Sequence, residues 1–567
     1  MESIKEKPKV IDFFCGAGGF SEGFRQQDFK VVMGIDNWRS AVETHNLNHH
    51  LNDAPRDILD FKKSIDEIEK LPDTEVIVGS PPCVLFSMSN KAGTADKTLG
   101  IQLIEAYLRV VAVKKHKQNS KLNAWFLENV PNSRKYVQAS YTFRDLDLVD
   151  WAKNIGLNPD SIALEISKNS TILNSADYGV PQRRERFVCG EIIGTGKLVV
   201  PEKTQEKFRT LGEIKNKMPK PNSPQNREIW ADPNYEILQL STDKITDHFY
   251  DTGIYEMYWR NTRDYKLNHP YMGRMSFPED ETRPSRTIMA TRASSSREAL
   301  IYKSEYRRKG DGEYRTPTIR EIACLMGFPV AYQFVGGEGT KWEQVGNAVP
   351  PFLSASLAKT VRIALGLKVI SPSAIGFSSL LGNHQKINNL NTYSEKKFDK
   401  PPKRKSLSRF RRHPFKAGNM TVALTNYNPA GKIRVGGEKW YSAVFYSTGR
   451  DYAVEVLEPR DFRRLEKIII KNRGLKGKQF ISEFDRRFQS ALKNIDQFQQ
   501  AYEKPSSSTK TFDPVYFIEN LAKFISLHDP DLEHIESPEP IASRTVLPIR
   551  QLYAMYAINR LISTQHE

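Results

Sequence analysis

Short apolar runs alternate with helical patterns through residues 9–130, and this alternation constrains the fold of the chain. Strands that alternate with helices over short connections predict a doubly wound, mostly parallel sheet of the α/β class. The carboxyl ends of such strands meet at one edge of the sheet, which is where ligands bind. The expected strands are residues 9–14, 30–36, 76–78 and 124–127, and the expected helices include 40–46 and 99–115.

The composition indicates a soluble protein with an anionic partner. The chain has 567 residues, enough for about two to four domains. Its net charge of +17 favours binding to a polyanion such as nucleic acid. No run of about 18 apolar residues occurs, so we expect no membrane span. The polar amino terminus lacks an apolar signal core, which favours a cytoplasmic location. The four cysteines, Cys15, Cys83, Cys189 and Cys324, show no metal-ligand spacing, so we expect neither a metal nor a disulfide framework.

Four segments are expected along the chain. The strand–helix periodicity weakens after about residue 195 and returns with a helix that begins near Phe352. A stretch rich in lysine and arginine then precedes a second region of strand and helix patterns. The predicted segments are an α/β domain at 1–195 completed by 342–369, a smaller domain at 196–341, a basic linker at 370–416 and an accessory α+β domain at 417–567.

A glycine-rich turn follows the first expected strand. Gly16, Gly18 and Gly19 allow the backbone to pass close to a ligand at the start of a helix, and Asp36 ends the next strand. An open backbone with a carboxylate beside it suits a cofactor that carries a ribose. Because the pattern is not the full dinucleotide fingerprint, it favours a small adenosine cofactor. A plain nucleotide-binding turn or a tight loop would also explain these glycines.

Cys83 and Glu128 each follow an expected strand of the sheet, so their side chains could meet at its carboxyl edge. A thiolate beside a carboxyl group suits attack on a heteroaromatic ring, because the carboxyl can bond or protonate the ring nitrogen that gains charge. Taken alone, Pro81-Pro82-Cys83 would more often be a rigid turn with a structural cysteine.

Two arginines, Arg184 and Arg186, lie in the charged run 182–186 just before an expected strand. Alternate residues of an extended segment leave it on one face. We therefore expect both guanidinium groups on the same side, where they could hold a carbonyl or an anionic group. The alternative is a solvated run of charges.

Taken together, these segments resemble the C5-cytosine-specific DNA methyltransferases. The resemblance covers about residues 8–368, and its motifs occur in the family's linear order. The matching segments are 12–20 (Asp-Phe-Phe-Cys-Gly-Ala-Gly-Gly-Phe), 79–83 (Gly-Ser-Pro-Pro-Cys), 128–130 (Glu-Asn-Val), 182–186 (Gln-Arg-Arg-Glu-Arg), 315–329 and 344–351 (Gln-Val-Gly-Asn-Ala-Val-Pro-Pro).

The resemblance implies that 1–195 with 342–369 is the catalytic domain, which binds the methyl donor, and that 196–341 is the target-recognition domain. It also implies a catalytic mechanism. A target cytosine would be flipped out of duplex DNA, Cys83 would attack its C6, and Glu128 would contact N3 and the exocyclic amine. Arg184 and Arg186 would position the cytosine carbonyl and the loop that carries the nucleophile. The methyl donor would be S-adenosylmethionine, with no metal. The residues implied to bind it are Phe14, Gly16, Gly18, Gly19, Asp36, Asn37 (or its neighbour Trp38), Asp57, Ile58, Pro81, Leu99, Asn347 and Val349.

The resemblance also implies the biological setting. The expected partner is double-stranded DNA, and the enzyme would act as a monomer, with no membrane attachment, at the bacterial nucleoid. It would protect DNA in a restriction-modification or defence system, with a separately encoded restriction endonuclease as its counterpart. Two other hypotheses are an RNA methyltransferase and a catalytically silent DNA-binding relative. The carboxyl-terminal domain lies outside the resemblance, and its pattern favours added DNA recognition or partner binding over a fused nuclease.

Overall fold

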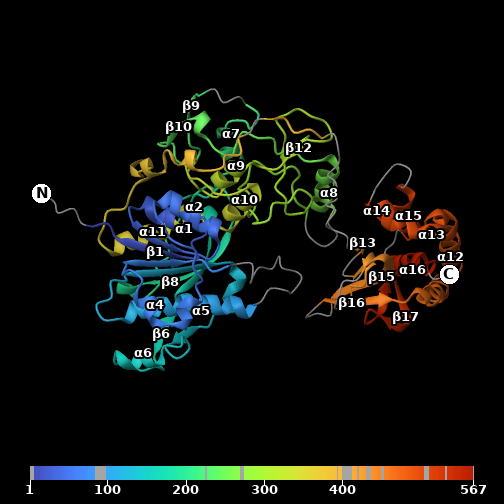
Figure 1. The fold of residues 1–567 in the computed structure, drawn as a ribbon, viewed down its shortest axis with the longest axis horizontal. Helices are drawn as coiled ribbons and strands as arrows, with labels where there is room; N and C mark the ends of the chain where they lie inside the picture. Colours follow the sequence, from blue (N-terminus) through green and yellow to red (C-terminus); the bar gives the residue numbers. More distant parts are fainter. Residues whose placement is uncertain are drawn as a thin grey trace. The chain divides into compact units, whose positions relative to one another are not determined.

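The computed structural model divides the chain into two units, Met1–Pro401 and Pro402–Glu567, called unit 1 and unit 2 below (Figure 1). The residues that the structure describes are 6–82, 97–223, 227–268, 274–391, 394–398, 412–417, 420–429, 436–447, 452–503, 510–529 and 533–565.

A six-stranded sheet forms the centre of unit 1, with the strand order β2-β1-β3-β4-β8-β7. The pairings of β1 with β2, β1 with β3 and β3 with β4 are parallel, whereas β8 pairs antiparallel with β4 and β7. The predicted α/β class is thereby confirmed as a mixed, largely parallel sheet with helices. The strands are β1 (Lys9–Phe13), β2 (Lys30–Ile35), β3 (Val76–Gly79), β4 (Ala124–Asn129), β7 (Ser170–Asn174) and β8 (Glu185–Ile192).

Both faces of this sheet are apolar and covered by helices. Along β4, Ala124 and Phe126 belong to one buried cluster, whereas Trp125 and Leu127 belong to another. This alternation follows from the two-residue period of a strand. Helices α1 and α11 cover the first face and α5 covers the second (Figure 1). The helices of the catalytic part are α1 (Gly19–Gln26), α2 (Arg39–His49), α3 (Asp60–Lys63), α4 (Ile65–Glu69), α5 (Lys97–His116), α6 (Val149–Asn154), α10 (Glu338–Asn347) and α11 (Pro351–Ala364).

Short elements and long connections make up the region between β8 and α10. They share one buried cluster with α10, to which Trp342 and Val345 contribute. The elements of this region are α7 (Leu211–Lys217), β9 (Ile229–Ala231), β10 (Gln239–Ser241), α8 (Glu256–Leu267), β11 (Tyr302–Lys303), β12 (Tyr314–Arg315) and α9 (Ile319–Leu325).

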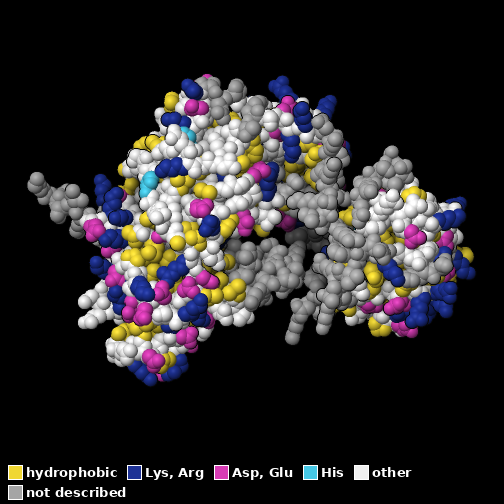
Figure 2. Space-filling model, in the orientation of Figure 1, with side chains coloured by type: hydrophobic (Ala, Val, Ile, Leu, Met, Phe, Trp, Pro, Cys, Tyr) yellow, Lys and Arg dark blue, Asp and Glu magenta, His cyan; other side chains and the backbone are white. Residues whose placement is uncertain are grey.

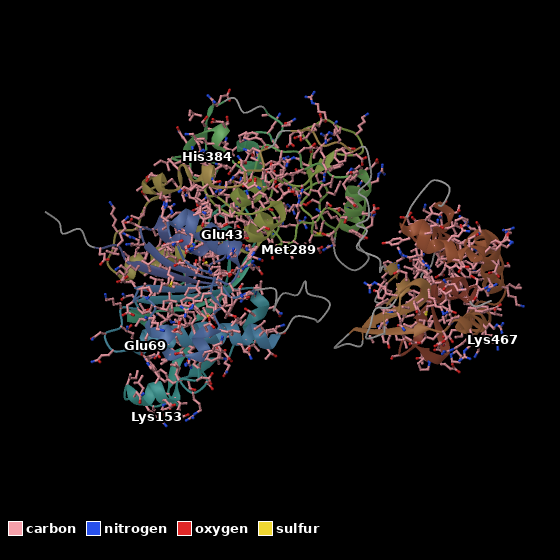
Figure 3. The ribbon with its side chains drawn as sticks, viewed as in Figure 1. Glu43, Glu69, Lys153, Met289, His384 and Lys467 are labelled. Atoms are coloured by element: carbon pink, nitrogen blue, oxygen red, sulfur yellow. The ribbon has the colours of Figure 1, made fainter. Side chains whose placement is uncertain are left out.

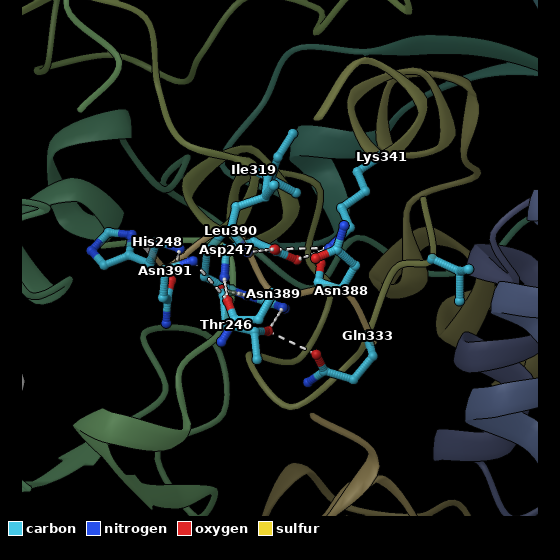
Figure 4. Close-up of polar contacts among 12 residues, drawn as sticks. Thr246, Asp247, His248, Ile319, Gln333, Lys341, Asn388, Asn389, Leu390 and Asn391 are labelled. Atoms are coloured by element: carbon cyan, nitrogen blue, oxygen red, sulfur yellow. Dashed lines mark hydrogen bonds and ion pairs between the residues drawn. The ribbon is translucent and has the colours of Figure 1, made fainter. Parts of the chain in front are cut away.

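Residues 370–391 pack on unit 1, although the charge pattern predicted a linker from 370 onward. Ile375, Phe377 and Leu380 join the buried cluster of the recognition region, which explains the difference. Residues 388–391 then contact a buried ion pair between Lys341 and Asp247, whose N–O distance is 2.8 Å (Figure 4). Lys341 donates to the carbonyl of Asn388, and the Leu390 amide donates to Asp247.

Unit 2 is built around helix α16 (Ile549–Ser563), which is buried on nearly all sides. An antiparallel sheet of order β13-β14-β15-β16 and the helix α12 pack against it. The rings of Phe480 and Tyr553 stack with centroids 3.8 Å apart at this contact. The other elements are β13 (Arg412–Ala417), β14 (Met420–Tyr427), β15 (Gly436–Ser447), β16 (Tyr452–Leu457), α12 (Phe462–Arg487), α13 (Gln489–Lys493), α14 (Phe498–Glu503), α15 (Pro514–His528), β17 (His534–Ile541) and β18 (Arg544–Pro548).

The described residues contain no helix that is both long and apolar enough to cross a membrane.

The substitution Lys341→Met tests the buried ion pair. It removes the cation and leaves the Asp247 carboxylate buried without its partner, so we expect the free energy of unfolding to fall by about 3–5 kcal/mol. The measurement is urea unfolding followed by tryptophan fluorescence. The control is Lys63→Met, which removes an exposed pair with Asp60 and is expected to cost less than about 1 kcal/mol. Equal losses in the two variants would contradict the assignment, and Lys341→Met combined with Asp247→Asn should recover most of the loss.

Candidate functional site

A cavity of about 270 Å³ opens at the carboxyl edge of the parallel strands. The ends of β1, β2, β3 and β4 contribute residues to it, and the carboxyl-terminal part of α10 closes one side. Its lining includes Phe14, Gly16, Gly19, Asp36, Asn37, Asp57, Ile58, Pro81, Asn347, Val349, Glu128 and Arg186, together with Cys15, Ala17, Phe20, Trp38, Ser80, Pro82, Leu103, Glu343, Gln344 and Ala348.

The glycines of the turn allow close contacts with other parts of the protein. A Cβ atom on Gly19 would lie 2.1 Å from the carbonyl oxygen of Val349, so only glycine lets α1 approach the segment before α11. Gly18 has a φ of +85°, and a Cβ there would lie 2.4 Å from the hydroxyl of Tyr332. Gly18 is outside the cavity lining, so its role is to allow the turn and this packing.

Asp36 is held in place at the end of β2. Its carboxylate accepts hydrogen bonds from the amides of Gly16 at 3.0 Å and Trp38 at 2.8 Å. Burial raises the pKa of this carboxyl, while the backbone donors act in the opposite direction. A carboxylate fixed by backbone amides at the end of a strand can accept hydrogen bonds from the hydroxyls of a ribose.

Glu128 and Arg186 form a buried ion pair in the cavity wall, with an Nε–Oε1 distance of 2.7 Å. Burial raises the pKa of the Glu128 carboxyl, against the effect of Arg186 and Arg184. A carboxyl with a raised pKa is protonated at a higher pH than usual, so it can donate a hydrogen bond or a proton to a bound base.

The loop that follows β3 is tied to neighbouring strands. The side chain of Asn129 donates to the carbonyl of Pro81 at 3.1 Å, and the amide of Ser80 donates to the carbonyl of Phe13 at 3.1 Å. Cys83, the predicted nucleophile, lies outside the described residues. The tethered residues before it border the same cavity as Glu128.

Arg184 contacts backbone carbonyls instead of the cavity. Its guanidinium donates to the carbonyls of Gly346 at 2.8 Å, Ala348 at 3.2 Å and Ile288 at 3.3 Å. The two arginines therefore differ in position: Arg186 borders the cavity, and Arg184 holds the segment that carries Asn347 and Val349.

The prediction for Leu99 also differs from the structure. Leu99 is exposed and outside the cavity lining, whereas Leu103 lies one turn later on α5 and lines the cavity. The sequence argument missed Glu343 and Gln344 as well. Glu343 is four residues before Asn347 on α10, and this helical spacing was the signal that could have found it.

Most of unit 1 is similar to a known protein family. Residues 8–362 match the model of the family described as C-5 cytosine-specific DNA methylase. The chain belongs to this family.

This chain aligns with several curated relatives over most of the length of each relative. The type II methyltransferase M1.HphI of Haemophilus parahaemolyticus is 27% identical over 62% of this chain and 86% of that protein. The putative type II methyltransferase M.MJ0563P of Methanocaldococcus jannaschii is 28% identical over 62% of this chain and 98% of that protein. A solved structure of a putative DNA modification methyltransferase from an E. coli prophage is 18% identical, with a TM-score of 0.41, over 64% of this chain and all of that chain. The prediction of a DNA cytosine-5 methyltransferase is confirmed by the family match.

The methyltransferase family implies S-adenosylmethionine as the methyl donor, and the cavity fits that molecule. The close approach at Gly19 leaves no room for a side chain, the aromatic ring of Phe14 offers an apolar contact, and Asp36 offers an acceptor. Within the described residues, no group of three or more His, Cys, Asp or Glu side chains could hold a metal ion.

The substitution Asp36→Ala tests this cofactor assignment. A charged acceptor contributes about 1.5–3 kcal/mol to a hydrogen bond, so we expect affinity for S-adenosylmethionine to fall by roughly 10- to 100-fold. Isothermal titration calorimetry measures the change. The control is Asp53→Ala. The Asp53 carboxylate accepts a hydrogen bond from the amide of Gly34, but Asp53 lies outside the cavity lining. Unchanged affinity in Asp36→Ala would contradict the assignment.

Proposed function

We propose that the enzyme methylates C5 of a cytosine flipped out of duplex DNA, with Cys83 as the nucleophile and Glu128 as the acid. The observation that carries the proposal is the buried Glu128–Arg186 pair, which borders the same cavity as the glycine turn and the residues that lead to Cys83. A nucleophile, an acid and a cofactor turn at one sheet edge are what this chemistry requires.

Each residue has a separate role in the reaction. The Cys83 thiolate adds to C6 of cytosine, and the negative charge that develops on the ring is stabilised by the protonated Glu128 carboxyl at N3. Burial raises the pKa of that carboxyl, which favours its protonated form, and Arg186 fixes its orientation. After C5 is methylated, a base removes the C5 proton and the C6–sulfur bond breaks. These steps restore the aromatic ring and the thiolate.

The cofactor pocket orients the methyl donor. Bound S-adenosylmethionine supplies an electrophilic methyl group on a sulfonium. Asp36 would accept from the ribose hydroxyls, Phe14 would pack on the adenine, and Asp57 and Ile58 would border the same ring. Asn347 and Val349 would close the opposite side, and Arg184 holds their segment through its bonds to Gly346 and Ala348.

The biological role follows from the relatives. Several of them are named type II methyltransferases, and this supports a place for the enzyme in bacterial restriction-modification, at the nucleoid, with a separately encoded endonuclease. Residues 196–341 would read the target sequence, and the enzyme would act as a monomer. RNA methylation and silent DNA binding are the competing hypotheses, and the intact Glu128–Arg186 pair argues against the silent one.

The substitution Cys83→Ala tests the nucleophile. We expect loss of methyl transfer to unmethylated duplex DNA with retained binding of S-adenosylmethionine, because the thiol is needed for chemistry and not for the cofactor. The assay uses the labelled methyl donor, with DNA and tRNA offered separately, followed by bisulfite sequencing of the DNA. Unchanged methylation in Cys83→Ala would disprove the mechanism, and label in tRNA alone would move the substrate to RNA.

The substitution Glu128→Gln tests the acid. Glutamine keeps the size and the ability to bond to N3 but cannot supply the proton, so kcat should fall by about 10²- to 10⁴-fold. A matched control is Glu185→Gln. Glu185 is an exposed residue three positions before the buried Val188, and we expect its substitution to change kcat little. If both variants kept the full kcat in single-turnover assays, Glu128 would not be the acid.

A further inference from the structure

Unit 2 carries a disproportionate share of the positive charge. Residues 402–567 contain 28 lysine and arginine residues against 18 aspartate and glutamate residues. The excess of 10 is more than half of the net charge of +17 of the whole chain. A local excess of this kind marks a surface that attracts polyanions.

Seven of these cations and no acid lie in residues 402–416, and a second group of seven lies on helix α12. Residues 462–480 hold seven cations and one acid, Glu466. Five of the cations are exposed and define what we call the basic surface. Figure 2 shows dark-blue side chains gathered on unit 2 in the region where Figure 3 labels Lys467. These residues are Arg463, Lys467, Lys471, Lys476 and Lys478.

The basic surface lies opposite the buried face of the helix. Arg463, Lys467 and Lys471 follow one another at intervals of four residues, which places them about 6 Å apart along one stripe. Leu465, Ile468 and Ile469 on the other side enter the core of unit 2. The stripe therefore cannot turn inward without opening that core.

Several acids near α12 are paired with other cations, and Glu466 is the one acid within residues 462–480. Arg464 pairs with Glu539 at 3.0 Å, and Arg473 pairs with Glu533 and, at 3.8 Å, with Asp529. Within the described residues, none of the five cations of the basic surface has an ion-pair partner. Their charge is therefore available to an external anion.

An apolar side chain projects within this surface. Gly474 interrupts the helical backbone of α12 with a φ of 52° and a ψ of −123°. The next residue, Leu475, is 84% exposed and lies beside Lys476. An exposed leucine among cations offers an apolar contact to sugars or base edges beside the phosphates.

We propose that the basic surface of α12 binds the phosphate backbone of duplex DNA, independently of sequence, with Leu475 in contact with the groove. The choice of DNA as the polyanion rests on the proposed function of unit 1. Duplex DNA carries one charge per about 1.7 Å of its axis, so a stripe of cations at about 6 Å intervals can face a phosphate at every position.

A lipid surface fits these residues less well. A helix that lies on a membrane needs a wide apolar face of its own. The apolar face of α12 is used by the core of unit 2, and Leu475 is its single exposed large hydrophobic residue among those described.

The test compares two triple variants of the full chain with equal loss of charge. One is Lys467→Gln/Lys471→Gln/Lys476→Gln on the basic surface, and the control is Lys439→Gln/Lys493→Gln/Lys523→Gln, three exposed lysines on other elements. Binding to a 30-base-pair dA·dT duplex is measured by fluorescence anisotropy from low to high salt. This duplex contains no cytosine, so it cannot report on the catalytic site.

The basic-surface variant should show a weaker salt dependence. The slope of log K against log salt is negative, and each lost phosphate contact reduces its magnitude by about 0.9. The loss of three contacts should therefore reduce the magnitude by about 2.7. The control should keep the wild-type slope. Leu475→Ser should lower affinity severalfold without changing the slope, because it removes no charge.

Two results would overturn the proposal. The first is an equal change of slope in both triple variants, which would mean a general effect of net charge. The second is unchanged DNA binding in the basic-surface variant with lost binding to phosphatidylglycerol vesicles or to RNA. Methyl transfer is measured in parallel at saturating cytosine-containing DNA. If the wild-type chain showed no methyl transfer, that result would count against the proposed function. The dA·dT binding data would still test whether the basic surface binds DNA.

Discussion

The buried guanidinium of Arg184 joins three parts of unit 1 that are far apart in sequence. It donates to the carbonyl of Ile288 in the recognition region and to those of Gly346 and Ala348 before α11. A buried charge without such partners would be strongly destabilising. The segment 346–349 is thereby fixed, and it is this segment that Gly19 approaches within van der Waals contact. The shape of the cofactor cavity depends on one side chain that does not line it.

The Glu128–Arg186 pair depends on a different constraint. Arg186 lies inside β8, where the ladder with β4 sets Glu128 opposite Val188, and its guanidinium reaches Glu128. The rigid strands thus fix the distance between the two charged groups, and burial raises the pKa of the Glu128 carboxyl. Such preorganisation suits an acid that must act only when a base fills the cavity.

Much of this arrangement followed from local patterns in the sequence. The apolar runs, the glycine turn and Asp36 specify a strand, a turn and a second strand, and these elements occur where the patterns predict. The carbonyl partners of Arg184 did not follow, because they come from segments far away in the sequence, which the two-residue period of a strand does not identify. Leu99 is outside the cavity lining because the packing of α5 against the sheet decides which turn of the helix reaches the cavity, and Leu103 lies there. The charge pattern predicts a linker over 370–416, but it does not show which apolar residues a distant segment will bury, and Ile375, Phe377 and Leu380 pack in the buried cluster of the region between β8 and α10.

The division of charge between the two units has a kinetic consequence for an enzyme that must find its target. In unit 1, many arginines are committed to internal partners, such as Arg315 with Glu305 and Glu321. In unit 2, five cations of α12 are exposed, and neighbouring acids pair with Arg464 and Arg473 of the same helix. Two DNA-binding elements on one chain raise the effective concentration of each for the same duplex. Backbone binding by the basic surface would hold the enzyme on DNA while the cavity of unit 1 samples cytosines, because a sequence-independent electrostatic contact permits sliding and hopping along the duplex.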